Sequence, residues 1–183
     1  SLIVWDSQTG QLLQTLGGHA WGIKSVAFNP EGTLLASASL DTTAAVWDLS
    51  SGQELLRLTG HTATVWSVVF SPDGARLAGL SDPTPGASGD GSVWDLHVFV
   101  LRTGEELLSQ NLSGYLEDVS SVVGWRDAWT PVVSAVRAGG GPGVLIAYSS
   151  RDGSSDVLVR AGEAEVPPYY LTSRVAADVL GSA

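Results

Sequence analysis

The chain has 183 residues, with 9 Lys and Arg against 19 Asp and Glu, which gives a formal net charge of −10 at pH 7. Nucleic-acid binding needs clustered positive charge, and Lys24 is the single lysine, so we do not expect nucleic acid as a partner. The absence of cysteine excludes disulfides, thiolate metal sites and cysteine nucleophiles. No apolar run approaches the ~20 residues of a membrane span, so we expect no membrane partner either.

Apolar runs separated by turn residues predict short strands through the first 60 residues. Both faces of these runs are largely apolar, which is typical of sheets packed between two neighbouring sheets. A Pro-Gly turn is predicted at 29–32, and Gly10, Gly52 and Gly60 mark further turns. The predicted strands are 2–6, 11–16, 23–28, 34–39, 43–49 and 54–59.

Several landmarks recur at an interval of 42 residues. His19 is followed by His61, Trp5 by Trp47, and the turn at 28–32 by a similar turn at 70–74. Together with the path from Gly18-His19 to Trp47-Asp48, this pattern resembles the WD-repeat β-propeller family, whose repeats span ~40–45 residues. The resemblance implies an all-β fold built from four-stranded antiparallel blades.

The chain is short for such a propeller, since rings of this kind usually close with about seven blades. We expect an incomplete ring of about 3.5–4 blades over residues 1–160, with the remaining blades supplied by the same polypeptide. A compact four-bladed closure is the alternative. The expected divisions are a half-blade at 1–17, the best-formed blade at 18–59, a blade at 60–113 with an insertion at 81–91, a degenerate blade at 114–160, and a divergent tail at 161–183 with at most one strand and a disordered end.

The third unit has two candidates for the position of Trp47. Trp94-Asp95 matches the family dipeptide, but Trp47 precedes the turn glycine Gly52 by 5 residues. The same interval before Gly104 selects Phe99, which we favour.

Two alignments of the last third remain open. In the first, Gly114-Tyr115 and the run 119–123 mimic Gly60-His61 and the strand that follows it. In the second, 131–136 is the first strand and leads into a glycine-rich turn at 139–143. Under either alignment, the interval from Gly143 to Asp152 repeats the 9 residues from Gly32 to Asp41 and places 157–159 in the position of 46–48.

By the resemblance, His19, Asp41 and Trp47, with Ser37 or Ser39, form a structural tetrad. The indole N–H donates to the serine, the serine to His19, and His19 to the Asp41 carboxylate, a network that is strong only when complete. A Ser-His-Asp catalytic triad is the alternative.

The tetrad of the next repeat is only partial. His61 and Phe99 keep their places, but Gly79 and Pro83 replace Ser37 and Asp41, which predicts a softer blade. His97 is predicted to be a surface or packing residue.

The resemblance also implies a partner-binding face, formed by the loops before the first strand and between the second and third strands. Trp and Arg often dominate interface energies, although Trp66 packed between blades is an equal alternative. The insertion at 81–91 would project from this face. Aligned onto this chain, the face carries Lys24, Leu40, Thr64, Trp66 and Arg151.

We therefore expect a non-catalytic scaffold or regulatory module that binds a protein or peptide partner, with no catalytic residue, cofactor or metal. The three histidines are scattered, and no carboxylate pair suggests acid–base chemistry. The alternatives are an enzymatic or ligand-binding propeller with its site in missing blades, and a truncated repeat array with no independent function. The localisation is left open, with the cytoplasm as our expectation.

Overall fold

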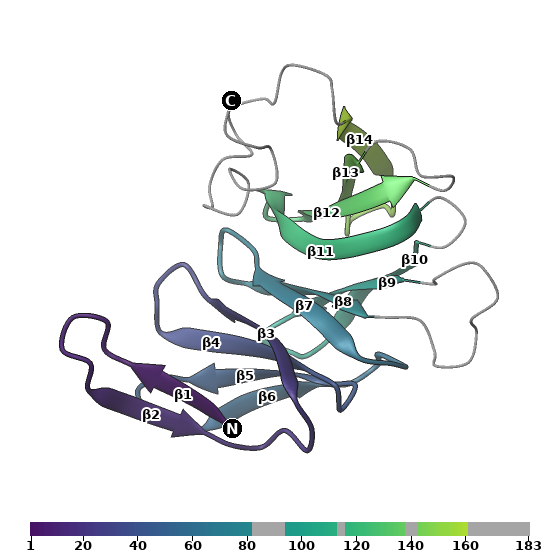
Figure 1. The fold of residues 1–183 in the computed structure, drawn as a ribbon. Helices are drawn as coiled ribbons and strands as arrows, with labels where there is room; N and C mark the ends of the chain where they lie inside the picture. Colours follow the sequence, from purple (N-terminus) through teal and green to yellow (C-terminus); the bar gives the residue numbers. More distant parts are fainter. Residues whose placement is uncertain (82–93, 113–115, 138–142, 161–183) are drawn as a thin grey trace.

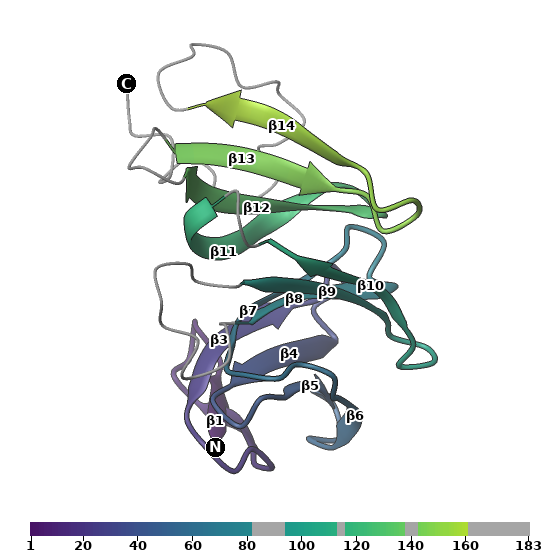
Figure 2. The same ribbon diagram turned by 90° about the vertical axis from the view of Figure 1, so that its right-hand side faces the viewer.

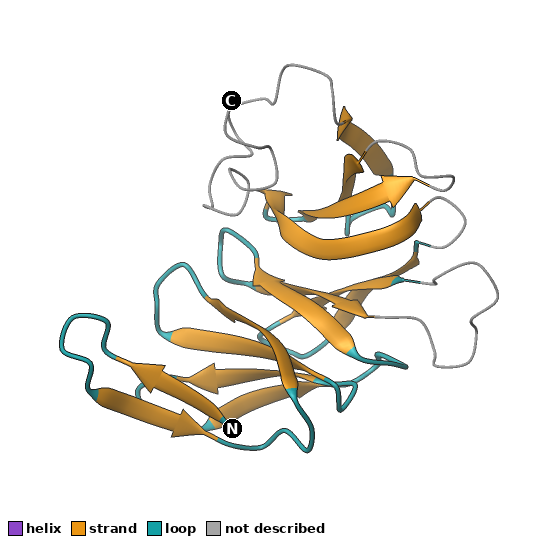
Figure 3. Cartoon of the chain, viewed as in Figure 1, coloured by secondary structure: helices purple, strands orange, loops and turns teal. Residues whose placement is uncertain are grey.

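The computed structural model describes residues 1–81, 94–112, 116–137 and 143–160, which form fourteen strands and no helix (Figure 3). The strands make one two-stranded and three four-stranded antiparallel sheets, each built from consecutive strands. The predicted all-β fold with four-stranded antiparallel blades is therefore confirmed. Among the described residues, no helix is long and apolar enough to cross a membrane. The 81–91 insertion, apart from Ser81, and the 161–183 tail lie outside the described residues.

The best-formed sheet consists of β3 (Ile23–Phe28), β4 (Leu34–Ser39), β5 (Ala44–Asp48) and β6 (Glu54–Leu58). The β3–β4 turn is held by Asn29, whose Oδ1 accepts the amides of Thr33 at 2.9 Å and Leu34 at 2.8 Å. In the β5–β6 turn Asp48 Oδ1 accepts the amides of Ser50 and Ser51 at 2.8 Å. These side-chain bonds explain why short polar residues stand at the turns that the sequence marks.

The next sheet consists of β7 (Val65–Phe70), β8 (Arg76–Ser81), β9 (Asp95–Val100) and β10 (Glu106–Asn111). Leu77 pairs with Phe99 as Leu35 pairs with Trp47 in the preceding sheet. Phe99 is only 2% exposed. The strand register therefore places Phe99 in the position of Trp47, while Asp95 opens β9.

The last sheet consists of β11 (Leu116–Asp127), β12 (Thr130–Arg137), β13 (Gly143–Tyr148) and β14 (Ser155–Arg160). The first alignment correctly placed 119–123 in the first strand, and 131–136 lies in the second. The alignment of 143–152 with 32–41 was wrong, because β13 pairs with both β12 and β14 and is the third strand. Tyr148, not residues 157–159, therefore occupies the position of Trp47, 5 residues before the turn glycine Gly153.

The sheets follow one another in chain order along an arc and do not close into a ring within the described residues (Figures 1 and 2). The two-stranded sheet at one end of the arc contains β1 (Leu2–Trp5) and β2 (Leu12–Leu16). Strands β3, β7 and β11 are the first strands of their sheets, and β7 contacts both of the others.

Alternate residues of β4 and β5 face opposite neighbours, as the two-residue period of a strand requires. Leu35, Ala45 and Trp47 pack towards β1 and β2, through Leu16, Leu2 and Val4. Ala36 and Val46 belong instead to the core shared with β7–β9. A third core joins the β7–β10 sheet to the last sheet through Trp125 and Tyr148. Both faces of β4 and β5 are therefore buried, which agrees with the largely apolar strands of this region.

Candidate functional site: the loop face and its supporting network

A four-residue network ties the entry loop of the β3–β6 sheet to its core. His19 lies 2.8 Å from Asp41 through Nδ1 and 2.8 Å from the Ser37 hydroxyl through Nε2. The indole of Trp47 donates to the same hydroxyl at 2.8 Å. Because the Nδ1–H of His19 donates a hydrogen bond to the Asp41 carboxylate, its unprotonated Nε2 accepts a hydrogen bond from the Ser37 hydroxyl. Ser37 is thus the serine of the network.

Ser39, the other candidate, has a different task. Its hydroxyl donates to the carbonyl of Gly22 at 3.1 Å and accepts the amide of Asp41 at 3.1 Å. It therefore joins the loop before β3 to the loop after β4. Ser37 is completely buried and its hydroxyl is engaged by the indole, so this serine cannot meet a substrate as a triad nucleophile would.

Asp41 is held as a carboxylate at the edge of this network. Burial opposes its charge, but hydrogen bonds from the Thr43 hydroxyl at 2.6 Å, from His19 and from the Ala20 amide at 2.9 Å outweigh it and lower its pKa. Arg57 adds an ion-pair contact at 3.8 Å. Because Asp41 binds Thr43 and Ala20 at once, it fixes both loops at this end of the sheet.

Gly18 is required by this packing rather than by backbone freedom. A Cβ at this position would lie 2.9 Å from Trp47 Cη2, 2.9 Å from Glu54 Oε2 and 3.0 Å from an Arg57 nitrogen. The glycine that precedes His19 therefore lets the chain pass over the edge of the buried indole.

Gly18→Ala is expected to lower the free energy of unfolding by about 1–3 kcal/mol, because the buried indole has little room to move. Chemical denaturation of the full chain measures this loss. Gly17→Ala is the matched control, since a Cβ there meets nothing within 4 Å. Equal effects of the two substitutions would contradict the packing explanation.

The β7–β10 sheet replaces the network with an aromatic cluster. His61 is buried, and neither ring nitrogen has a hydrogen-bond partner among the described residues. Its ring lies 4.0 Å from that of His97 and 5.7 Å from that of Phe99, measured between centroids. Gly79 provides the space, since a Cβ there would lie 3.0 Å from His61 Nε2.

His97 is 5% exposed and is therefore a packing residue, which is one of its two predicted roles. It stands opposite Gly79, in the register position that Ala45 occupies opposite Ser37. Its Nδ1 contacts the carboxylate of Glu106. Burial, with the charge of His97 as the second cause, lowers the pKa of His61 from 6.5 to about 3, so His61 is neutral.

Four of the predicted binding residues lie at one end of the strands, which we call the loop face. Lys24 and Trp66 come from neighbouring first strands, and the ammonium group lies 4.4 Å from the centroid of the indole ring. The amide of Leu40 donates to the Gly22 carbonyl at 2.9 Å. The loop face consists of Trp21, Lys24, Leu40, Thr64 and Trp66.

Trp21, which is 70% exposed, was not among the predicted binding residues. Its place directly before Gly22, in the loop that leads into β3, was the signal that could have found it. Trp66 is 37% exposed, so it is neither fully packed between the sheets nor fully open to solvent.

Arg151 does not belong to the loop face, which corrects the prediction. It lies in the β13–β14 turn, where the amide of Ser150 donates to the Trp129 carbonyl at 2.9 Å. Trp129 lies in the β11–β12 turn, and this is the end of the strands opposite Lys24 and Leu40. We call this opposite end the turn end. The misplacement follows from the alignment of 143–152 with the wrong strand.

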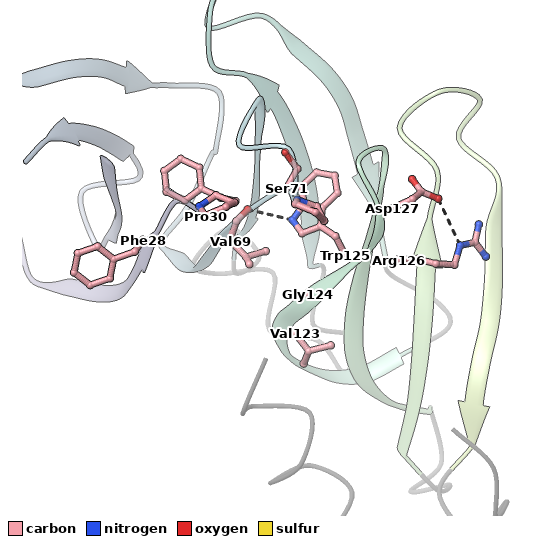
Figure 4. Close-up of a pocket in the computed structure, with 11 residues that line it drawn as sticks. Phe28, Pro30, Val69, Ser71, Val123, Gly124, Trp125, Arg126 and Asp127 are labelled. Carbon is pink, nitrogen blue, oxygen red and sulfur yellow. Dashed lines mark hydrogen bonds and ion pairs between the residues drawn. The ribbon is translucent and has the colours of Figure 1, made fainter. Parts of the chain in front are cut away.

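A pocket of about 600 Å³ opens at the turn end, between the ends of β3, β7 and β11 (Figure 4). No group of three or more His, Cys, Asp or Glu side chains in the described part of the chain could hold a metal ion. The residues that line the pocket are Phe28, Pro30, Val69, Phe70, Ser71, Pro72, Val123, Gly124, Trp125, Arg126 and Asp127.

The comparisons with known proteins agree with the fold and the hydrogen-bonded network in two parts of the chain. A family model described as "WD domain, G-beta repeat" matches residues 10–48 and 52–95, so the chain contains WD40 repeats in these two places. The second match ends at the Trp94-Asp95 pair, whereas the strand register equates Phe99 with Trp47.

Among known proteins, the chain is similar to periodic tryptophan protein 2 and its homologues. It is 52% identical over 42 residues to the homologue from Schizosaccharomyces pombe, covering 23% of this chain and 5% of that protein. It is 48% identical over 42 residues to the Mus musculus homologue, again 23% and 5% of the two chains. Periodic tryptophan protein 2 of Saccharomyces cerevisiae is 50% identical over 40 residues, covering 22% and 4%. The matches thus span about 5% of the length of these relatives.

Proposed function

We propose that this chain is a non-catalytic interaction module that binds a protein or peptide partner through the loop face. The observation that carries the proposal is the Lys24–Trp66 pair, in which two first strands present a cation and an indole together. Two WD40 repeats and the likeness to WD-repeat proteins support a scaffold role. A scaffold or regulatory function in the whole protein is part of this proposal.

The loop face has the features of an interaction surface on a rigid support. Trp21 and Trp66 expose aromatic area, and Trp side chains are over-represented among residues that dominate binding energy. Asp41 and Ser39 fasten the loops beneath them, so little conformational freedom is lost on binding. The Lys24 ammonium group restrains the Trp66 ring in the same way.

Affinity capture with the full chain tests the proposal. Proteins captured from a lysate of the source organism are quantified for the wild type and for Trp66→Ala and Lys24→Glu. We expect both substitutions to reduce capture of the specific partner by about tenfold or more, since loss of an interface aromatic costs more than 1.4 kcal/mol. Arg102→Glu, a charge reversal in the exposed β9–β10 turn, is the control and should leave capture unchanged. Capture that survives both loop-face substitutions would contradict the proposal, provided that thermal melts show folded variants.

A further inference from the structure

The pocket at the turn end is a half-open, mostly apolar hollow that is lined by three sheets at once. Phe28 comes from the end of β3, Val69 from β7 and Val123 from β11 (Figure 4). Pro30 and Pro72 belong to the turns that follow β3 and β7. Its volume of about 600 Å³ lies within the ~300–1,000 Å³ of ligand pockets. Phe28 is 56% exposed here, so its ring is accessible at the edge of the pocket.

One wall of this pocket is rigid. Trp125 is 6% exposed, and its indole donates to the carbonyl of Val69 at 3.3 Å, which ties β11 to β7 (Figure 4). A buried side chain and a hydrogen bond between sheets therefore support this wall of the pocket. A partner would meet a formed surface, which lowers the entropy cost of binding.

Arginine and tryptophan side chains adjoin the pocket. The Trp129 amide donates to Asp127 Oδ1 at 2.8 Å, and the Arg76 amide donates to Ser71 Oγ at 2.9 Å. Trp129 and Arg76 are therefore hydrogen-bonded to residues that line the pocket. The guanidinium carbon of Arg76 lies 3.3 Å from the centroid of the Trp129 ring, and that of Arg151 lies 4.5 Å from it.

The arginines at this pocket differ in their existing partners. Arg76 binds Asp73 at 3.0 Å and the Ala128 carbonyl at 3.2 Å. Arg126 lies 3.8 Å from Asp127 and 3.5 Å from Asp156. Arg151 makes no ion pair with any described residue.

Asp152, the acidic neighbour of Arg151 in the chain, forms no ion pair with it in the described structure. Asp152 accepts the Ser154 hydroxyl at 2.7 Å and the Ser154 amide at 3.0 Å, and is thereby committed to its own turn. Arg151 is exposed and oriented by the Trp129 ring, so its guanidinium can take one carboxylate in a defined place.

We propose that the turn end is a second docking surface, which binds an extended segment of a partner protein with an apolar side chain in the pocket and one carboxylate on Arg151. The charges favour a single carboxylate over a polyanion. The carboxylates of Asp127 and Asp156, whose side chains are 52% and 75% exposed, lie beside Arg126 and would repel a nucleic-acid backbone. This surface and the loop face lie at opposite ends of the strands, so the two proposals stand or fall separately.

A displayed library of random dodecapeptides tests this surface. The library is first depleted on the folded double variant Phe28→Ser/Arg151→Glu and then selected on the wild-type chain. We expect enriched peptides that combine Leu, Phe or Trp with Asp, Glu or a free C-terminal carboxylate. For these peptides, fluorescence anisotropy should show a Kd raised about tenfold or more by Arg151→Glu and by Phe28→Ser alone.

Two controls make the result specific. Arg102→Glu should leave the Kd unchanged, because Arg102 stands in the β9–β10 turn 2 residues before Gly104, as Arg151 stands before Gly153. Trp66→Ala should also leave it unchanged, since that residue belongs to the loop face. The inference is overturned if no peptide is enriched, if the enriched peptides lack a carboxylate, or if Trp66→Ala abolishes binding while Arg151→Glu does not.

Discussion

Replacement of Trp47 by alanine is expected to lower the free energy of unfolding by about 3–5 kcal/mol, the largest effect of any single substitution considered for this chain. The side chain is 2% exposed and fills the core between the first two sheets. Its indole N–H is bound to Ser37, so truncation removes both packing and a partner of the buried hydroxyl. A loss of this size is a large share of the ~5–15 kcal/mol that stabilise a typical domain.

Two further substitutions separate packing from hydrogen bonding. Trp47→Phe keeps most of the apolar volume but removes the N–H donor, and is expected to cost about 1–3 kcal/mol. Combined with Ser37→Ala in a double-mutant cycle, it should show coupling, because the two groups bind each other. Urea denaturation measures each value.

Trp5 provides the matched control. It precedes its turn glycine by the same 5 residues as Trp47 but is 57% exposed. Trp5→Phe should therefore change the unfolding free energy by less than about 0.5 kcal/mol. A Trp47→Phe effect no larger than that of Trp5→Phe would show that the network contributes nothing to stability.

Acidification is expected to destabilise the chain through His61. Its pKa is about 3 in the folded chain, against an ordinary value of 6.5. Between these values the unfolded chain binds a proton that the folded chain does not, so stability is fully present above pH 6.5 and is lost as the pH falls towards 3. One such group gives a slope of about 1.4 kcal/mol per pH unit at its steepest.

His61→Leu tests this pH dependence. The variant cannot take up the proton, so urea midpoints measured from pH 7 to pH 4 should fall less steeply than in the wild type. Asp41, whose pKa is lowered, loses its contribution only as the pH falls below its ordinary value of 3.8, and it remains in both proteins. Parallel pH profiles for the two proteins would show that His61 is accommodated without cost in its charged form.

The parts of the fold that the sequence predicts are those whose turns carry glycine. Gly32 and Gly74 have φ near +69° and +67°, which glycine adopts freely, and both follow a proline in the turn after a first strand. The strands on either side of Gly32 were predicted at 23–28 and 34–39, the bounds that the structure shows. The interval before Gly104 also located Phe99 although its strand lacks the tryptophan.

The last sheet could not be read in this way because its first turn has no glycine. Asp127 instead holds the β11–β12 turn, by accepting the amide of Trp129 and the hydroxyl of Thr130 at 3.0 Å. In addition, β11 shifts register relative to β12 between several residue pairs, which breaks the alternation that periodicity relies on. The missed turn displaced every later strand by one place.

For the candidate sites too, the sequence predicts what lies in the regular repeats and fails for what depends on the last sheet. The placement of Lys24 and Trp66 on one face followed from aligning two regular repeats, and the network followed from the resemblance of the best-formed repeat to the WD-repeat family. The Trp129–Arg151 contact could not be found, because it depends on a turn that the alignment had assigned to the other end of the sheet. Phe28 was recognised as a strand residue, but its exposed face becomes visible only when three sheets are placed together.

Every hydrogen-bonded ladder in the described chain joins strands that are neighbours in sequence, and buried side chains join one sheet to the next. Contact order is therefore low for an all-β protein, and backbone pairing in each sheet can begin before the next one has been made. During synthesis, a sheet could assemble as each repeat leaves the ribosome, with the apolar faces docking afterwards. Duplication or loss of one repeat in a gene would likewise leave the pairing of the others untouched.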